Sequence, residues 1–162
     1  MRPVGIALLA LVLGLASPSL AQEPPLDGTR PLDTPLVCLA RTIYFEARGQ
    51  SDQGMVAVGH VVMNRVKSPA YPDDLCAVVR EGKEEGPCQF SWWCDDKPNA
   101  ATDERAYHRA VHQAADILEG KAADPTKGAN MFHNSAASPA WAKKAEPRGR
   151  IGDHFFYYLE GR

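Results

Sequence analysis

The stretch LVCLARTIYFEARG, residues 36–49, has apolar residues that recur at the spacing of one helical face. We predict a helix from about Thr34 or Pro35 to Ala47, with Asp33 or Thr34 as its cap, Pro35 in its first turn and Gly49 after its end. At about 100° per residue, Glu46 falls at the edge of the apolar stripe. Its carboxyl should therefore be half-buried, hold its proton to higher pH, and be able to act as a general acid.

The first 21 residues have the features of a secretory signal peptide. Arg2 supplies a positive charge, residues 4–16 form an apolar run too short to span a bilayer, and Ser19-Leu20-Ala21 is a small-x-small cleavage site. We expect an exported mature chain, periplasmic or secreted, with a proline-rich leader at 22–35 and a catalytic domain at 36–162. No later segment is apolar for long enough to predict insertion in a membrane.

The length and net charge of the mature chain limit its domain number and its binding partners. Removal of 21 residues from 162 leaves about 141, which suits one domain with one core. Loss of Arg2 changes the formal net charge from −2 to −3, so we expect no broad attraction to nucleic acid or to anionic lipid.

The mature part contains four cysteines, which in an exported chain indicate two disulfides. Three pairings are possible. We favour Cys88 with Cys94, because the five residues between them can form a short closed loop, and hence Cys38 with Cys76. Four zinc-binding thiolates are a weaker alternative, because the chain has no CxxC pair.

The other predicted elements are mainly helical. A second helix, apolar nearly all round, should run from Asp52 to about Lys67 after a Ser51 cap, with Gly54 and Gly59 allowing close approach of neighbours. We predict a short third helix at 72–80, a hairpin strand at 89–93, a fourth helix from a Thr102 cap to about Leu118 or Glu119, and irregular chain after Thr126.

The order of these segments resembles the cell wall hydrolases of the SleB and CwlJ type, over about residues 36–157. The blocks that carry the resemblance are Cys38-Leu39-Ala40 with Ile43 through Gly49; Gly54 through Ala57 with Val62 through Val66; Pro72 with Cys76; Cys88 through Trp92 with Cys94; Asp124-Pro125-Thr126 with Gly128-Ala129; Phe132-His133 with Pro139 and Trp141; and Ile151-Gly152 with His154 and Phe156.

The resemblance implies a mainly α (α+β) domain, lysozyme-like or lytic-transglycosylase-like, with a small β-hairpin, that acts on the glycan strands of peptidoglycan. It also implies that Glu46 is the catalytic acid, that residues 89–91 (Gln89, Phe90 and Ser91) lie on a hairpin bordering the cleft, and that Phe132 and His133 form the opposite wall. Sugar sites combine flat aromatic faces with polar edges. We therefore add Trp92 and Tyr44 to the candidate substrate-binding residues. Trp141 could also offer a ring face, but we expect Phe90, Trp141, Phe155 and Phe156 to belong to the core.

Glycosidases usually need a second carboxylate. Asp52, Asp95 and Asp96 are candidates, but a cap or loop context explains each of them. A lytic transglycosylase avoids this need, because the 6-hydroxyl of muramic acid attacks C1 and leaves a 1,6-anhydro end. We therefore predict cleavage between N-acetylmuramic acid and N-acetylglucosamine by Glu46 alone, without a cofactor.

Two alternatives come from other classes. A zinc-dependent peptidoglycan amidase or peptidase would use His108 and His112, four apart on the fourth helix, with His133 or His154 as a third ligand. A catalytically silent module would only bind glycan. The sequence identifies no protein partner.

Overall fold

The computed structural model describes residues 28–29, 31–82 and 87–161. Its described part contains helices α1 (Pro35–Ala47), α2 (Asp52–Val66), α3 (Leu75–Arg80) and α4 (Glu104–Leu118), the 3-10 turns η1 (Ser91–Trp93) and η2 (Ala140–Lys143), and strands β1 (Met131–Asn134), β2 (Glu146–Ile151) and β3 (His154–Tyr158). The expected mainly α (α+β) class is confirmed. The predicted signal peptide and most of the leader lie outside the described residues. None of the described helices is long and apolar enough to cross a membrane.

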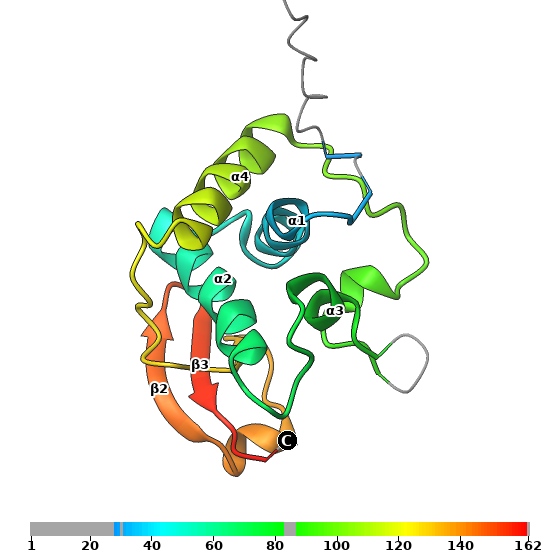
Figure 1. Ribbon diagram of the computed structural model, residues 1–162. Helices are drawn as coiled ribbons and strands as arrows, with labels where there is room; N and C mark the ends of the chain where they lie inside the picture. Colours follow the sequence, from blue (N-terminus) through cyan, green and yellow to red (C-terminus); the bar gives the residue numbers. More distant parts are fainter. Residues whose placement is uncertain (1–27, 30, 83–86, 162) are drawn as a thin grey trace, which may run out of the picture.

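Helix α1 lies at the centre of the helices, as Figure 1 shows, with α2, α3 and α4 packed around it. The Thr34 hydroxyl caps its start by accepting a hydrogen bond from the amide of Val37, and Pro35 occupies the first turn. Most of its side chains are buried, whereas Pro35 at its start and Arg48 after its end are exposed. The predicted helix is thus confirmed, Thr34 is the cap of the two candidates, and Glu46 lies in the last turn of α1.

Helix α2 packs closely against its neighbours because of one glycine. A Cβ atom on Gly59 would lie 2.5 Å from Cδ1 of Ile117 in α4 and 3.0 Å from Cδ1 of Ile43 in α1. Gly59 therefore lets three helices meet, as predicted. At Gly54 a Cβ would lie 2.8 Å from Cβ of Gln50, so the close neighbour there comes from the turn just before α2 and not from another helix.

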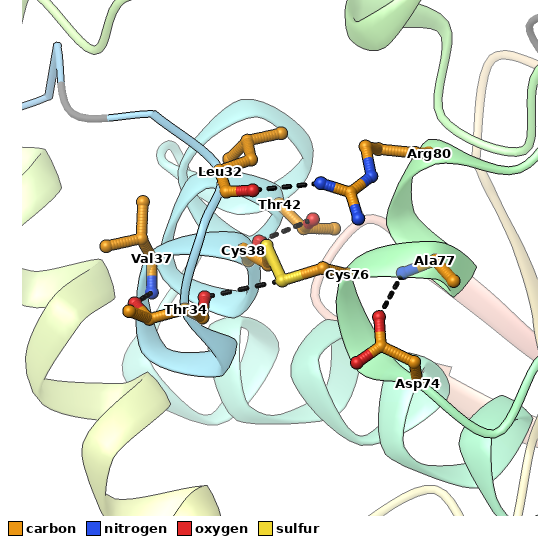
Figure 2. The surroundings of a disulfide bond; sticks show 9 residues. All are labelled: Leu32, Thr34, Val37, Cys38, Thr42, Asp74, Cys76, Ala77 and Arg80. Atoms are coloured by element: carbon orange, nitrogen blue, oxygen red, sulfur yellow. Dashed lines mark hydrogen bonds between the residues drawn. A yellow bond between two sulfur atoms is a disulfide. The ribbon is translucent and has the colours of Figure 1, made fainter.

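The favoured disulfide pairing is the one that the structure has. Cys38 of α1 is joined to Cys76 of α3, with 5.4 Å between their Cα atoms (Figure 2). Helix α3 begins at Leu75 and not near residue 72, because the Asp74 side chain caps it through the amide of Ala77 at 2.7 Å. The bridge therefore ties the first helix to a helix of only six residues, four of which are buried.

The second disulfide, Cys88–Cys94, explains why the hairpin strand predicted at 89–93 is wrong. An extended chain of six residues would span about 20 Å, whereas the two Cα atoms are 6.3 Å apart. The loop folds instead into the 3-10 turn η1, and Trp92 turns inward with 6% of its surface exposed.

The prediction of irregular chain after Thr126 is also wrong. Three antiparallel strands form a sheet in the order β1-β3-β2, with Phe132 opposite Phe156 and His133 opposite Phe155. The sheet packs below α2 in Figure 1. Strand β2 has a bulge between Pro147 and Gly149, and a turn with Gly152 at φ +58° joins it to β3. This β2–β3 hairpin is the small hairpin of the expected fold class, in another place along the chain.

Helix α4 begins one residue later than predicted. Its cap is Asp103 and not Thr102, because the Asp103 carboxylate accepts a hydrogen bond from the amide of Ala106 at 3.0 Å. Gly120, at φ +72°, follows its end as expected.

Candidate active site

A cavity of about 620 Å³ lies where the helices, the Cys88–Cys94 loop and the sheet meet. We call its three sides the helix wall, the loop wall and the sheet wall. The helix wall consists of Phe45, Glu46 and Arg65; the loop wall of Pro87, Cys88, Gln89 and Ser91; and the sheet wall of Met131, Phe132, His133, Asn134, Ala137, Trp141 and His154.

Glu46 is half-buried in the helix wall. Burial disfavours its charged form and raises the pKa of the carboxyl to about 7, while the positive charge of Arg65 acts in the opposite direction. Near neutral pH this group is present both as acid and as carboxylate. It can therefore donate a proton and then accept one, which is the requirement for a single acid–base catalyst.

Arg65 is held rigidly, with 3% of its surface exposed. Its Nε donates a hydrogen bond to the carbonyl oxygen of Asn130 at 2.8 Å. Its guanidinium also lies 5.1 Å from the ring centre of Phe90 and 5.5 Å from that of Tyr71. The sequence analysis did not identify Arg65 as a site residue, although a charged residue at the end of an otherwise apolar helix was the available signal.

His133 is the centre of an aromatic cluster in the sheet wall. Its ring stacks on Phe155 and Tyr157 at 5.5 and 5.3 Å, and its Nε2 lies 3.1 Å from the Tyr157 hydroxyl. Trp141 meets the same imidazole edge-on at 5.8 Å. Four aromatic residues were expected in the core. This is wrong for Trp141 and Phe155, which are only half-buried, and confirmed for Phe90 and Phe156, which are buried.

His154 contributes a neutral ring to the sheet wall. It is 5% exposed, and burial lowers its pKa; the Asp153 carboxylate opposes this effect and His133 adds to it. Its ring meets Phe132 edge-on at 5.2 Å. His154 is therefore uncharged at neutral pH and helps to keep Phe132 in place.

Four of the six predicted substrate-binding residues line the cavity: Gln89, Ser91, Phe132 and His133. The other two lie behind it, and their predicted contact with the sugar needs correction. Tyr44 is 1% exposed in the core, and its hydroxyl accepts a hydrogen bond from the amide of Asp103 at 3.1 Å. Trp92 stacks on Phe45 at 4.9 Å and supports the helix wall from behind.

Glu46 is the only acid among the described residues that line the cavity. Asp52 is bound to Arg109 at 2.7 Å, and Asp95 lies 3.4 Å from Lys97, so both belong to surface ion pairs. Asp96, at φ +55°, is an exposed turn residue. In the structure, these three candidates for a second carboxylate lie outside the cavity.

The histidine pair of α4 lies on the surface, where His108 is exposed and His112 is 3.4 Å from Asp116. His133 and His154 lie in the sheet wall. Within the described ranges, no group of three or more His, Cys, Asp or Glu side chains is placed to hold a metal ion.

Comparison with known proteins gives a consistent result. A family model described as Cell Wall Hydrolase matches residues 49–157, a range that begins three residues after Glu46. The spore cortex-lytic enzyme of Halalkalibacterium halodurans is 35% identical over 125 residues, 76% of this chain and 34% of that protein. The Bacillus subtilis enzyme of the same name is 32% identical over 120 residues, 73% of this chain and 35% of that protein. The chain thus spans about a third of the length of these curated relatives.

Solved structures show the same fold. The catalytic domain of the germination-specific lytic transglycosylase SleB from Bacillus anthracis superposes with a TM-score of 0.60 at 26% identity, covering 75% of this chain and 92% of that one. The catalytic domain of the Bacillus cereus SleB protein gives a TM-score of 0.57, also at 26% identity, over 75% and 88% of the two chains.

Proposed function

The chain belongs to the cell wall hydrolase family, and from this premise we propose that it is an exported enzyme that cleaves the glycan strands of peptidoglycan. We further propose that it cuts between N-acetylmuramic acid and N-acetylglucosamine as a lytic transglycosylase. The likeness to a domain whose name includes lytic transglycosylase supports the reaction class. The observation that carries the mechanism is Glu46, half-buried, with a pKa of about 7, and without another acid among the described residues that line the cavity.

The proposed reaction uses Glu46 twice. Its protonated carboxyl donates a proton to the glycosidic oxygen, so that the bond to C1 of the muramic acid breaks and the N-acetylglucosamine leaves with its hydroxyl. The 6-hydroxyl of the same muramic acid ring then bonds to C1, and the Glu46 carboxylate accepts the proton of that hydroxyl. The products are a 1,6-anhydro end and an enzyme that is again protonated, so no water enters the reaction.

The other cavity residues have roles in binding. Phe132, His133 and Trp141 offer rings to the apolar faces of the sugars, while Gln89 and Ser91 offer amide and hydroxyl groups to their edges. The Cys88–Cys94 bridge keeps the last two at the cavity. Tyr44 and Trp92 support α1 and Phe45, and do not touch the glycan in this proposal.

Export follows from the signal peptide predicted at 1–21. Two disulfides fit an oxidising compartment, either the periplasm or the medium. We place the catalytic domain at 36–162, preceded by the leader at 22–35.

The direct test is digestion of purified peptidoglycan by the mature chain, residues 22–162, followed by mass analysis of the soluble fragments. We expect 1,6-anhydro-muramic ends. Reducing muramic ends would replace the transglycosylase with a hydrolase, free stem peptides would indicate an amidase, and binding without fragments would indicate a silent module.

The Glu46→Gln variant tests the acid itself. Because glutamine has nearly the same shape but its amide is far too weak an acid to protonate the leaving oxygen, we expect cleavage to fall about a thousandfold while the fold is kept. Glu160→Gln, near the exposed C-terminal end, is the matched control and should cleave like the wild type. Near wild-type turnover by Glu46→Gln would overturn the assignment.

A further inference from the structure

A second, shallower hollow of about 280 Å³ adjoins the proposed catalytic cavity. Its lining residues come from β1, the η2 region and β3: His133, Ser138, Pro139, Ala142, Lys143, Phe155 and Tyr157. His133 also lines the cavity that contains Glu46. A substrate bound beside Glu46 can therefore continue over the His133 ring into this hollow without leaving the surface.

The floor of the hollow is aromatic because of the register of the sheet. His133 and Phe155 are directly opposite each other, and Tyr157 is two residues further along β3, so the three side chains share one face. Trp141 of η2 packs edge-on against both His133 and Tyr157, at 5.8 and 5.5 Å. The turn η2 is thus fixed over this face and places Lys143 at the rim.

The charge at the rim indicates the ligand. Lys143 is exposed, and the hollow has no acidic residue among its described lining residues. The Ser138 hydroxyl and the Lys143 ammonium can both donate hydrogen bonds to an anion, while Pro139, Phe155 and Tyr157 offer apolar surface. A carboxylate on an apolar stem satisfies both features, whereas a neutral sugar makes no use of the cation.

We propose that this hollow is a subsite for a carboxylate of the stem peptide carried by the muramic acid in the cleft. The proposal rests on the proposed function, because it takes peptidoglycan to be the substrate. It adds a substrate preference: the enzyme prefers strands whose muramic acids carry acidic peptides. Lys143 produces this preference by binding the peptide carboxylate.

The test compares two substrates that differ only in charge. Glycan strands with intact stem peptides are one, and the same strands with the peptide carboxylates converted to neutral amides are the other. For the wild type we expect kcat/KM to be about threefold to fivefold higher on the acidic strands, the range of a partly exposed ion pair, and the ratio to shrink as salt is added.

The neighbouring lysines provide a matched pair of variants. Lys143→Ala should bring the ratio close to one and Lys143→Glu should bring it below one, whereas Lys144→Ala should keep the wild-type ratio because Lys144 does not line the hollow. A wild-type ratio of one, or the same ratio in Lys143→Ala and Lys144→Ala, would overturn the proposal.

Binding separates this proposal from the proposed function. Calorimetry with a soluble muramic acid disaccharide that carries its peptide can use the Glu46→Gln chain, in which no cleavage interferes. If the wild type cleaves neither strand, the catalytic proposal fails. The subsite then still stands if binding weakens about threefold to fivefold on adding Lys143→Ala or amidating the peptide, and falls if neither change alters binding.

Discussion

The helix wall and the sheet wall enclose the same cavity but differ in how they treat charge. In the helix wall, Glu46 is half-buried and Arg65 is 3% exposed, so water is largely removed from both charges. In the sheet wall, His133 and Trp141 are half-buried and Asn134 is exposed. The helix wall therefore raises the proton affinity of its acid at a cost in stability, whereas the sheet wall offers surface to a ligand.

The largest stability effect should come from removing the buried carboxyl. Because the pKa of Glu46 is raised from 4.5 to about 7, the folded chain holds a proton that the unfolded chain releases in this interval. The wild type should therefore lose stability as pH rises through this window, by at most about 3 kcal/mol. Glu46→Gln should not show this loss.

Urea unfolding at pH 4 and pH 8 measures this difference, with Glu160→Gln as the exposed control. The free energy of unfolding of Glu46→Gln should exceed that of the wild type at pH 8 and be close to it at pH 4. An equal difference at both pH values would mean that the helix wall does not perturb its acid.

A somewhat smaller loss of stability is expected from a substitution at Asp124, in the loop that connects the sheet wall to α2. Oδ1 of Asp124 accepts hydrogen bonds from the amide and hydroxyl of Thr126, and Oδ2 accepts them from the amide of Gly128 and from Asn64 of α2 at 2.9 Å. Burial alone would raise the pKa of Asp124, but these bonds outweigh it and lower the pKa. Asp124→Asn turns one acceptor into a donor that faces two donors and should cost about 2 kcal/mol at pH 7.

The exposed Asp73→Asn is the control for this substitution, and thermal or urea unfolding is the measurement. The Asp124 carboxylate stabilises the fold only while it is charged. The difference in free energy of unfolding between Asp124→Asn and the wild type should therefore shrink as pH falls below about 3.8, the ordinary pKa of the group. Full stability of Asp124→Asn at pH 7 would mean that the loop before β1 does not hold the sheet wall against α2.

The third prediction concerns the charge balance within the helix wall. Arg65→Gln removes the positive charge that lowers the pKa of Glu46, so the pH at which half of the activity is lost on the alkaline side should move upward. We expect kcat/KM at pH 9 to rise by about tenfold, because more of Glu46 then stays in the protonated form that starts the reaction.

Arg65→Lys is the matched variant, because it keeps the charge and loses the bond from Nε to Asn130. Its pH profile should stay close to that of the wild type even if its stability falls. A shift of the same size in both variants would make Arg65 a packing residue only.

The smallest effect is expected in the sheet wall. Trp141→Ala removes a ring face from the cavity without touching the proton chemistry, so KM should rise about fivefold with little change in kcat. Tyr158, at the exposed end of β3, lies outside the cavity, and Tyr158→Ala is the control. A large loss of kcat in Trp141→Ala would show that the sheet wall also positions the reacting atoms.

The two walls also differ in how far the sequence predicted them. The helix around Glu46 has a regular apolar spacing, a cap and a proline, and all three are local signals. Strand β2 reads Glu146-Pro147-Arg148-Gly149-Arg150-Ile151, in which only Ile151 is a β-forming residue and no alternation is present, and its bulge adapts it to β3. In β3, aromatic residues at 155–158 hide the alternation that leaves Phe156 buried and Phe155 half-buried.

The site residues, too, could be predicted only where a local pattern or the family resemblance identified them. Glu46 could be placed by helical geometry, and Gln89, Ser91, Phe132 and His133 by the resemblance. Arg65 reaches the cavity only through the tertiary packing of α2, so local patterns gave it no site role. Trp141 was considered as a ring face for the sugar but assigned to the core, because its place at the cavity depends on the packing of η2. Tyr44 and Trp92 were misplaced, because an aromatic residue near a cleft can equally well pack behind it.

The proposed mechanism requires that the helix wall raise the pKa of Glu46 to near the working pH. A carbon-13 NMR titration of the glutamate carboxyls, with Glu46→Gln used to assign the resonance, measures this directly. We expect a midpoint of about 7 for Glu46. A midpoint close to the ordinary 4.5 would contradict it.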